Sequence, residues 1–359
     1  DGNNRLTDVI QTTSGNEKQI THYELDGVGN TVATYTGLTE LYTEDMEESG
    51  CTVTSYEYDR QNQLLRTVYP DGTEESNSYN IFGNLDTSTD RNGAVTYYFY
   101  DAMNQLVQKS ILYDVTAEYS YTAEGYLASE TDVFNITVSY EYDDLGRKTR
   151  EIQSDGVVKE YSYDNLGNQT SAVVKLDGVV QSAVAYSYDS LNRMTQVKEG
   201  DEVIAAYTYD ANGNRASLTQ GGVTTTYTYN DANLVTSLTN KKGTATLSSY
   251  SYTYYLDGNQ RTKTDVVNNK TTTYGYDLAG RLTSESESGG NTYAYTYDSR
   301  NNRTKMTVSG TDNYTVTYTY DKMDRLLTET KTVGNRQEIT NYAYDNNGNQ
   351  ILKTQSVLE

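Results

Sequence analysis

A short phrase of the form Tyr-x-Tyr-Asp-x-x-Gly/Asn recurs along the whole chain of 359 residues. In one copy it runs from Tyr140 to Gly146. The spacing between copies is 21 residues five times in succession from Tyr58 to Tyr163, and it is 20 to 25 residues after that. With an incomplete first copy at Asp1, the chain holds 16 copies. A period of this length predicts a repeat architecture in which each copy is one supersecondary unit.

The position four residues after the second tyrosine is the most uniform part of the phrase. It is glycine in nine copies, asparagine in six and aspartate in one. These residue types tolerate a positive backbone φ better than others do. We therefore expect every copy to turn through a left-handed conformation at this position. The glycines are Gly29, Gly83, Gly125, Gly146, Gly167, Gly213, Gly258, Gly280 and Gly348.

The residue directly after the second tyrosine is usually aspartate. Its carboxylate can accept hydrogen bonds from backbone N–H groups of the same turn, so we expect an Asx-type turn in each copy. Thr122 and Tyr255 depart from this pattern. The aspartates on which the prediction rests are Asp59, Asp101, Asp143, Asp164, Asp189 and Asp210.

A second turn signal lies about half a repeat after the first, as Asp71-Gly72 in one copy and Asp155-Gly156 in another. Such pairs are the strongest short signals for a hairpin. The segments between the two turns are rich in Thr, Val, Tyr and Ser, which is typical of strands. We therefore predict an all-β fold of repetitive antiparallel hairpins that form a continuous, spiralling sheet.

Tyrosine supplies the apolar surface that this sheet needs. The chain has 38 Tyr, 3 Phe and no Trp, with a net charge of -22. Few aliphatic residues and high charge would otherwise indicate disorder. Tyrosines two positions apart leave the same face of a strand, and thirteen copies carry such a pair. We expect two rows of rings that leave one face of the sheet dry, with leucines such as Leu64 and Leu106 between them. The structural tyrosines are Tyr58, Tyr100, Tyr142, Tyr163, Tyr188, Tyr209, Tyr276, Tyr297, Tyr320 and Tyr344.

The number of copies sets the size of the sheet. Two strands per copy give about 32 strands, or a ribbon roughly 150 Å long at about 4.8 Å per strand. Sheets this wide curl, close or coil. Stability should come from contacts between neighbouring copies, as in other repeat proteins.

Composition also excludes several kinds of site. The single cysteine, Cys51, allows no internal disulfide and no cysteine-based zinc site, and no motif surrounds the single histidine, His22. The net charge of -22 opposes binding to nucleic acid and to anionic membranes. No apolar run is long enough to insert into a bilayer. We predict no catalytic residue, no cofactor and no metal.

The tyrosine phrase resembles the signature of the YD-repeat, or RHS-repeat, family: a Tyr-Asp pair with Gly or Asn three residues later at a spacing near 21. The resemblance covers essentially the whole chain. The family includes bacterial RHS toxins, components of insecticidal toxin complexes, wall-associated bacterial proteins and teneurin adhesion receptors. The resemblance implies a β-sheet that spirals into a hollow shell, which encloses a cytotoxic segment in the toxins and serves adhesion in teneurins.

The chain departs from complete RHS toxins at one point. Those proteins end the shell with Asp-Pro motifs and an aspartyl autoprotease, whereas the only proline here, Pro70, precedes Asp71. We therefore infer neither self-cleavage nor a toxin payload. The chain starts and stops inside a copy, so we interpret residues 1–359 as a single array and a section of a longer one.

Three features have two interpretations each. The row of aspartates could bind Ca²⁺, or each could cap its own turn. The tyrosine rows could stack on sugars, or pack against each other and leucine. The acidic insertion at 35–50, which includes Glu40, Glu44, Asp45, Glu47 and Glu48, could contact a basic partner or be a solvated excursion.

The leading hypothesis is a non-enzymatic structural scaffold of a secreted or cell-surface bacterial protein. It would be a wall that encloses cargo or a stiff spacer for cell contact. Its partners would be flanking repeats of the same protein or an enclosed polypeptide. Three alternatives stay open: an adhesion module for glycans or a cell-surface receptor, a shell fragment of a toxin-delivery protein, and a filament that assembles through exposed terminal strands.

Overall fold

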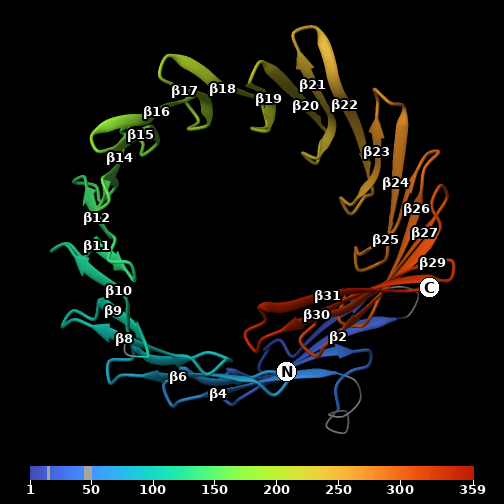
Figure 1. Ribbon diagram of the computed structural model, residues 1–359, viewed down its shortest axis with the longest axis horizontal. Coiled ribbons are helices and arrows are strands. Elements are labelled where there is room, and N and C mark those ends of the chain that lie inside the picture. Colours follow the sequence, from blue (N-terminus) through green and yellow to red (C-terminus); the bar gives the residue numbers. More distant parts are fainter. Residues whose placement is uncertain (14–16, 44–50, 113) are drawn as a thin grey trace. The chain divides into compact units, whose positions relative to one another are not determined.

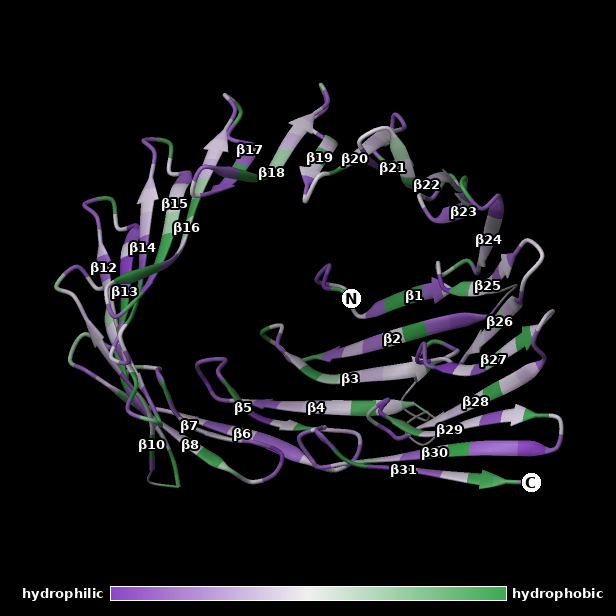
Figure 2. Ribbon diagram, turned by 45° about the horizontal axis from the view of Figure 1, so that its top comes forward, coloured by the Kyte–Doolittle hydropathy of each residue, from purple (hydrophilic) through white to green (hydrophobic). Residues whose placement is uncertain are grey.

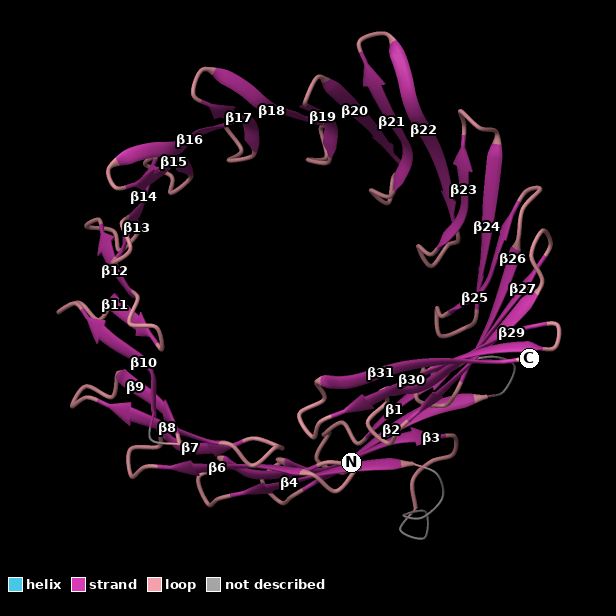
Figure 3. Ribbon diagram, in the orientation of Figure 1, coloured by secondary structure: helices cyan, strands magenta, loops and turns pink. Residues whose placement is uncertain are grey.

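The computed structural model describes residues 1–13, 17–43, 51–112 and 114–359. Over these residues the protein contains 31 strands in one sheet and no helix (Figure 3). The prediction of an all-β fold made of antiparallel hairpins is therefore confirmed. The described residues also contain no helix that is long and apolar enough to cross a membrane.

The first half of the strands runs from the N-terminus to residue 188. These strands are β1 (Asp8–Thr12), β2 (Lys18–Leu25), β3 (Thr31–Leu38), β4 (Thr52–Tyr58), β5 (Leu64–Val68), β6 (Glu74–Tyr79), β7 (Leu85–Thr89), β8 (Val95–Tyr100), β9 (Leu106–Ile111), β10 (Asp114–Tyr121), β11 (Leu127–Asp132), β12 (Thr137–Tyr142), β13 (Lys148–Gln153), β14 (Val157–Tyr163), β15 (Gln169–Leu176) and β16 (Val179–Tyr188).

The second half continues to the C-terminus (Figure 1). These strands are β17 (Met194–Glu199), β18 (Glu202–Tyr209), β19 (Arg215–Gln220), β20 (Val223–Tyr229), β21 (Val235–Lys242), β22 (Ala245–Tyr254), β23 (Gln260–Asp265), β24 (Lys270–Tyr276), β25 (Leu282–Glu287), β26 (Thr292–Tyr297), β27 (Arg303–Ser309), β28 (Tyr314–Tyr320), β29 (Leu326–Val333), β30 (Arg336–Tyr344) and β31 (Gln350–Leu358).

Strands that follow one another in sequence pair antiparallel, and the pairing shifts register at the second tyrosine of the phrase. Between β20 and β21, Thr228 pairs with Ser237 but Tyr229 pairs with Val235. The same shift occurs at Tyr142, Tyr209 and Tyr320. A bulge of this kind bends the strand and increases its twist, and here it lies directly before the turn that follows the phrase.

The strands belong to two compact units. Unit 1 comprises Asp1–Thr96, Tyr254–Thr262 and Lys270–Glu359, and unit 2 comprises Tyr97–Thr253 and Lys263–Asn269. Unit 1 thus combines the first and last parts of the chain. Figure 2 shows its strands β1–β4 beside the strands that follow β24. Unit 2 contains the copies in the middle of the chain.

Few side chains are buried, and most of them lie in unit 1. Ile20, Ala33, Tyr35 and Leu38 form one buried cluster, against which Tyr42, Cys51 and Val53 pack. Val308, Val316 and Tyr318 are also buried in unit 1, whereas the only buried hydrophobic residue described in unit 2 is Ala205.

The predicted dry face is wrong in degree, since most repeat tyrosines are only half-buried: Tyr142, Tyr209 and Tyr297 are examples, whereas Tyr318 in unit 1 is buried. The half-buried rings are covered in part by neighbouring strands and are not shielded completely from solvent.

The predicted insertion at 35–50 begins later than expected. Residues Tyr35 to Leu38 belong to β3, and Tyr35 and Leu38 are part of the buried cluster. Tyr42 returns to the sheet and stacks on His22, with ring centroids 4.3 Å apart. Glu40 is exposed. The acidic residues Glu44, Asp45, Glu47 and Glu48 lie outside the described residues.

Candidate functional site

The turn after each Tyr-Asp phrase, here called the tyrosine turn, has one backbone conformation throughout the chain. The residue four positions after the second tyrosine has a positive φ in all 16 copies, for example 89° at Gly213 and 59° at Asn233. The other residues with positive φ at this position are Asn4, Gly29, Asn62, Gly83, Asn104, Gly125, Gly146, Gly167, Asn192, Gly258, Gly280, Asn301, Asp324 and Gly348.

The aspartate of the phrase closes its own turn. Oδ1 of Asp143 accepts the backbone N–H groups of Leu145 and Arg147, both at 3.0 Å. Asp59, Asp101, Asp164, Asp189 and Asp210 accept the corresponding pairs of N–H groups. Because the carboxylate holds these donors together, it acts as a structural cap in every one of these turns.

The pKa values of three of these aspartates follow from the same contacts. A hydrogen bond from the Arg147 side chain, with backbone N–H groups behind it, lowers the pKa of Asp143. The side chains of Asn168 and Arg193 lower the pKa values of Asp164 and Asp189 in the same way. The charged form is therefore the one that the folded turn stabilises.

The next residue along, five positions after the second tyrosine, links neighbouring copies. Arg147 donates from Nε to Asp143 in its own turn at 2.7 Å and from Nη1 to the carbonyl of Asp164 in the next turn at 2.8 Å. Its guanidinium also lies 4.9 Å from the ring centroid of Tyr163. One side chain thus joins two turns through a hydrogen bond, an ion pair and a cation–π contact.

Asparagine makes the same link in other copies. Asn168 donates to Asp164 at 2.9 Å and to the side chain of Asn192 in the next turn at 3.0 Å. In one copy Tyr126 takes this position, and its ring stacks on Tyr142 with centroids 5.0 Å apart. The position is therefore a connector whose chemistry and partner atoms vary between copies.

This connector was not among the predicted site residues, although the sequence carries a signal for it. The position is Arg or Asn in 12 of the 16 copies and Gln in two more. The signal is easy to miss, because the glycine before it accounts for the turn on its own. The connector residues are Arg5, Asn30, Gln63, Asn84, Gln105, Tyr126, Arg147, Asn168, Arg193, Asn214, Leu234, Asn259, Arg281, Asn302, Arg325 and Asn349.

The second tyrosine of the phrase also joins neighbouring copies. The hydroxyl of Tyr163 donates to the carbonyl of Lys148 at 2.8 Å, and Lys148 begins a strand of the copy before. Tyr79, Tyr121, Tyr142, Tyr188, Tyr209, Tyr229, Tyr297, Tyr320 and Tyr344 donate to the corresponding carbonyls. Tyr58, Tyr100 and Tyr276 end their strands at the same repeat position.

The first tyrosine of the phrase lies beside cations that come from the strand between two copies. Lys148 Nζ is 5.2 Å from the ring centroid of Tyr140 and 5.8 Å from that of Tyr161. Lys109 lies in the same way between Tyr98 and Tyr119. Lys148 stands at the repeat position where other copies carry the predicted leucine, and Lys109 lies beside its two rings in addition to Leu106 of the same strand.

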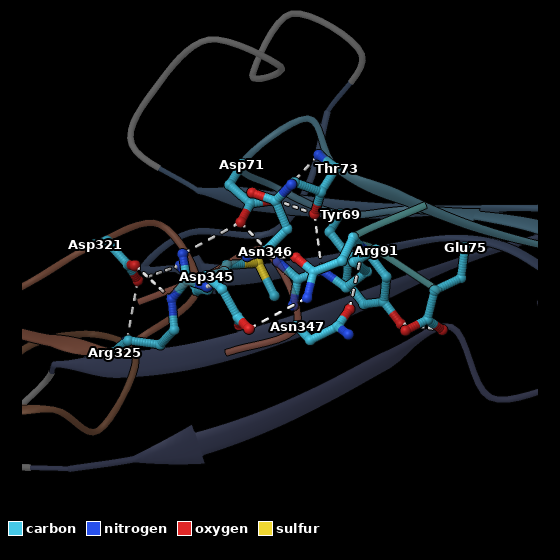
Figure 4. Close-up of polar contacts among 12 residues, drawn as sticks. Tyr69, Asp71, Thr73, Glu75, Arg91, Asp321, Arg325, Asp345, Asn346 and Asn347 are labelled. Atoms are coloured by element: carbon cyan, nitrogen blue, oxygen red, sulfur yellow. Dashed lines mark hydrogen bonds and ion pairs between the residues drawn. The ribbon is translucent and has the colours of Figure 1, made fainter. Parts of the chain in front are cut away.

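In unit 1 the tyrosine turns of the last copies meet earlier parts of the chain along a contact that we call the seam. It joins Thr13, Gln19, Gly37, Asp71 and Asn92 to residues between 278 and 347. Arg325 pairs with Asp71 at 3.3 Å across 254 positions of sequence, and Arg91 pairs with the same carboxylate at 2.7 Å (Figure 4).

The seam continues on both sides of this ion pair. Nδ2 of Asn347 donates to Asp90 at 2.8 Å, and the N–H of Leu278 donates to the carbonyl of Thr13 at 2.7 Å. Gly37, at a φ of 85°, lies so close to Arg300 that a Cβ there would be 2.9 Å from its Cγ. The two parts of the chain that meet at the seam are thus in close contact, through hydrogen bonds and through the packing of Arg300 against Gly37.

The described side chains form no reaction centre that we can identify. His22 is engaged by Asp8 at 2.9 Å and by the stacked ring of Tyr42. In the part of the chain that the structure describes, no group of three or more His, Cys, Asp or Glu side chains could hold a metal ion. What the repeats do provide is a set of contacts between neighbouring copies, such as those of Arg147 and Tyr163.

Comparison with known families agrees with the repeat pattern. Residues 209–245, 254–292 and 279–312 match the model described as RHS Repeat, which confirms the resemblance inferred from the tyrosine phrase. No curated protein sequence matches the chain.

Solved structures share the fold at low sequence identity. A Tc holotoxin pore of Photorhabdus luminescens with a TccC3 mutation is 14% identical, with a TM-score of 0.61 over 94% of this chain and 23% of that chain. The crystal structure of TcdB2-TccC3-TEV is 14% identical, with a TM-score of 0.53 over 95% of this chain and 24% of that chain. The chain therefore spans about a quarter of the length of the structures it matches.

Proposed function

We propose that this chain, which contains RHS repeats, is a non-enzymatic wall segment of a secreted or cell-surface bacterial protein. The observation that carries the proposal is the double link between copies, through the connector residue and the second tyrosine. Arg147 and Tyr163 show both links in one place. Because these links recur between neighbouring copies, we expect the sheet to resist separation of its strands.

The seam supports a wall rather than a loose ribbon. In unit 1, copies that are far apart in sequence are held together by Arg325, Asp71 and Asn92. Polypeptide in the same protein outside this chain, or a second protein, is the cargo that such a wall would enclose. A role as a stiff spacer for cell contact needs the same rigidity and no enclosed cargo.

Protease protection of the complete gene product tests this function. The protein is treated with a broad-specificity protease, and mass spectrometry follows which peptides survive. An enclosing wall predicts that peptides from outside the repeats survive for as long as the repeats do. If they are lost while the repeats stay intact, the array encloses nothing, and the spacer function replaces it.

Electron microscopy of the same sample gives an independent measurement. A wall around cargo should show density inside the sheet, and a spacer should show none. Turnover of any small molecule by the purified repeats would contradict a purely structural role.

A further inference from the structure

Two exceptions to the repeat meet at one place in unit 1. Tyr255 occupies the position that is Asp in most other copies, and Gly275 is the middle residue of a Tyr-x-Tyr pair that carries a side chain in every other copy. The hydroxyl of Tyr255 donates to the carbonyl of Tyr274, next to Gly275, at 3.0 Å. Tyr255 thus adds an aromatic ring where other copies have a smaller side chain, and Gly275, close by, lacks the side chain that other copies have.

These exceptions line an open pocket with a volume of about 740 Å³. The rings of Tyr255 and Tyr276 form two of its walls, with centroids 6.2 Å apart and planes at 87°. The rest of the lining around Gly275 is made by Thr13, Leu256, Asp257, Asp277, Leu278 and Thr283. Aromatic walls with a few polar groups are typical of small-molecule sites, and the volume is in their range.

The walls are exposed and held in place before any ligand arrives. Tyr255 is 40% exposed and Leu256 fully exposed, although both are large and apolar. The hydrogen bond to Tyr274 fixes the Tyr255 ring at its far end. Because the ring is already ordered, binding does not have to order it at a cost in conformational entropy.

The charged residues of the lining are Asp257 and Asp277. Each carboxylate oxygen of Asp257 accepts one hydrogen bond from Asn259, at 3.0 and 2.9 Å, and retains capacity for a further donor. The carboxylate of Asp277 is occupied by Arg281 at 2.6 Å. The site therefore favours a ligand with an apolar face and with hydroxyl groups at its edge that can donate to Asp257.

We propose that this cavity binds a neutral pyranose ring of a glycan. The C–H face of the sugar lies on Tyr255, and its hydroxyl groups donate to Asp257. This role adds a glycan contact to the proposed wall and does not depend on whether the wall encloses cargo.

The two exceptions can be reverted to residues that other copies carry. Tyr255→Asp restores the usual turn aspartate. Gly275→Thr adds a Cβ that would lie 2.5 Å from Oγ of Ser284, its partner in β25, so the Ser284 hydroxyl has to rotate to admit the new side chain. Thr208 and Ser217 form the same kind of cross-strand pair at 2.7 Å. Both variants should therefore fold, which circular dichroism and a thermal melt would verify.

The experiment is saturation-transfer NMR on the whole chain with uncharged methyl glycosides of glucose, galactose and N-acetylglucosamine. We expect transfer to the C–H face of at least one glycoside. We expect its affinity to fall at least about tenfold in Tyr255→Asp, as loss of an aromatic contact implies. Asn230→Asp, at the same repeat position in β20–β21, is the matched control and should bind as the unchanged protein does.

Two results would overturn the proposal. One is no transfer to any glycoside, or transfer that is unchanged in folded Tyr255→Asp and Gly275→Thr. The other is binding of N-acetyl-arginine amide in place of the glycosides, because the cavity would then be a site for basic side chains.

Discussion

Units 1 and 2 are built from the same repeat but differ in what covers the sheet. In unit 2 each strand has neighbours only on its two sides, and Ala205 and Ser110 are the residues described there as buried. In unit 1 the seam adds contacts across the ends of the strands, and Ile20 and Val308 are each 2% exposed. The repeat alone is therefore enough to form a sheet. A buried core is found in the unit where distant copies also contact each other.

The largest expected effect on the free energy of unfolding comes from a substitution in the buried core of unit 1. Ile20→Ala removes a fully buried side chain and should lower the free energy of unfolding by about 2–4 kcal/mol, since it loses transfer energy and leaves a cavity. The matched change in unit 2 is Ile152→Ala, where the side chain is only half-buried. We expect roughly 1 kcal/mol there. Urea unfolding measures both, and equal losses would contradict the difference between the units.

The second prediction concerns a feature that the units share. Gly213→Val puts a β-branched residue at a φ of 89° and should cost about 1–3 kcal/mol through backbone strain. Gly213→Asn should cost far less, because Asn192 and Asn233 hold the same repeat position at 59°. The same pair of changes at Gly280 tests unit 1. Thermal melts would refute the explanation if valine and asparagine behaved alike.

A third prediction isolates the seam. Arg325→Gln removes the connector and the ion pair with Asp71, whereas Arg193→Gln in unit 2 removes a connector that pairs with its own turn. The difference between them should be about 0.5–1 kcal/mol, the usual size for such a pair. It should shrink in high salt, because screening weakens the interaction. A salt-independent difference would assign the effect to packing.

The smallest effect is a dependence on alkaline pH. Burial, together with a hydrogen bond to Glu75, raises the pKa of Tyr69 to about 12, while Arg91 opposes the shift. Burial first, and then Glu130, raises the pKa of Tyr140 in unit 2. A raised pKa means that stability is complete below the unfolded value of about 10 and declines as pH rises toward the folded value.

This prediction is checked by urea unfolding between pH 9 and about 11.5. Tyr69→Phe and Tyr140→Phe should each flatten the decline, in unit 1 and unit 2 respectively. An unchanged pH profile in both variants would show that other tyrosines carry the effect.

Much of the local structure could be predicted because its causes lie within a few residues. The positive φ at Gly213 and Asn233 follows from residue type, and the bonds of Asp143 from the turn itself. The connector at Arg147 was within reach of the same reasoning, since Arg and Asn recur at its position. The pocket at Tyr255 could not be predicted in this way. The sequence shows Tyr255 only as a departure from the repeat, whereas the pocket also needs Gly275 of the next copy in its lining.

The amino-acid sequence by itself determined the strands, the turns and the order in which they pair, since hydrogen bonding and side-chain alternation act between adjacent segments. Only the tertiary structure decided which distant copies meet, as Arg325 and Asp71 do across 254 positions. That choice follows from small bends and twists added over many strands. No single copy specifies their sum, and so no single copy reveals where the buried core forms.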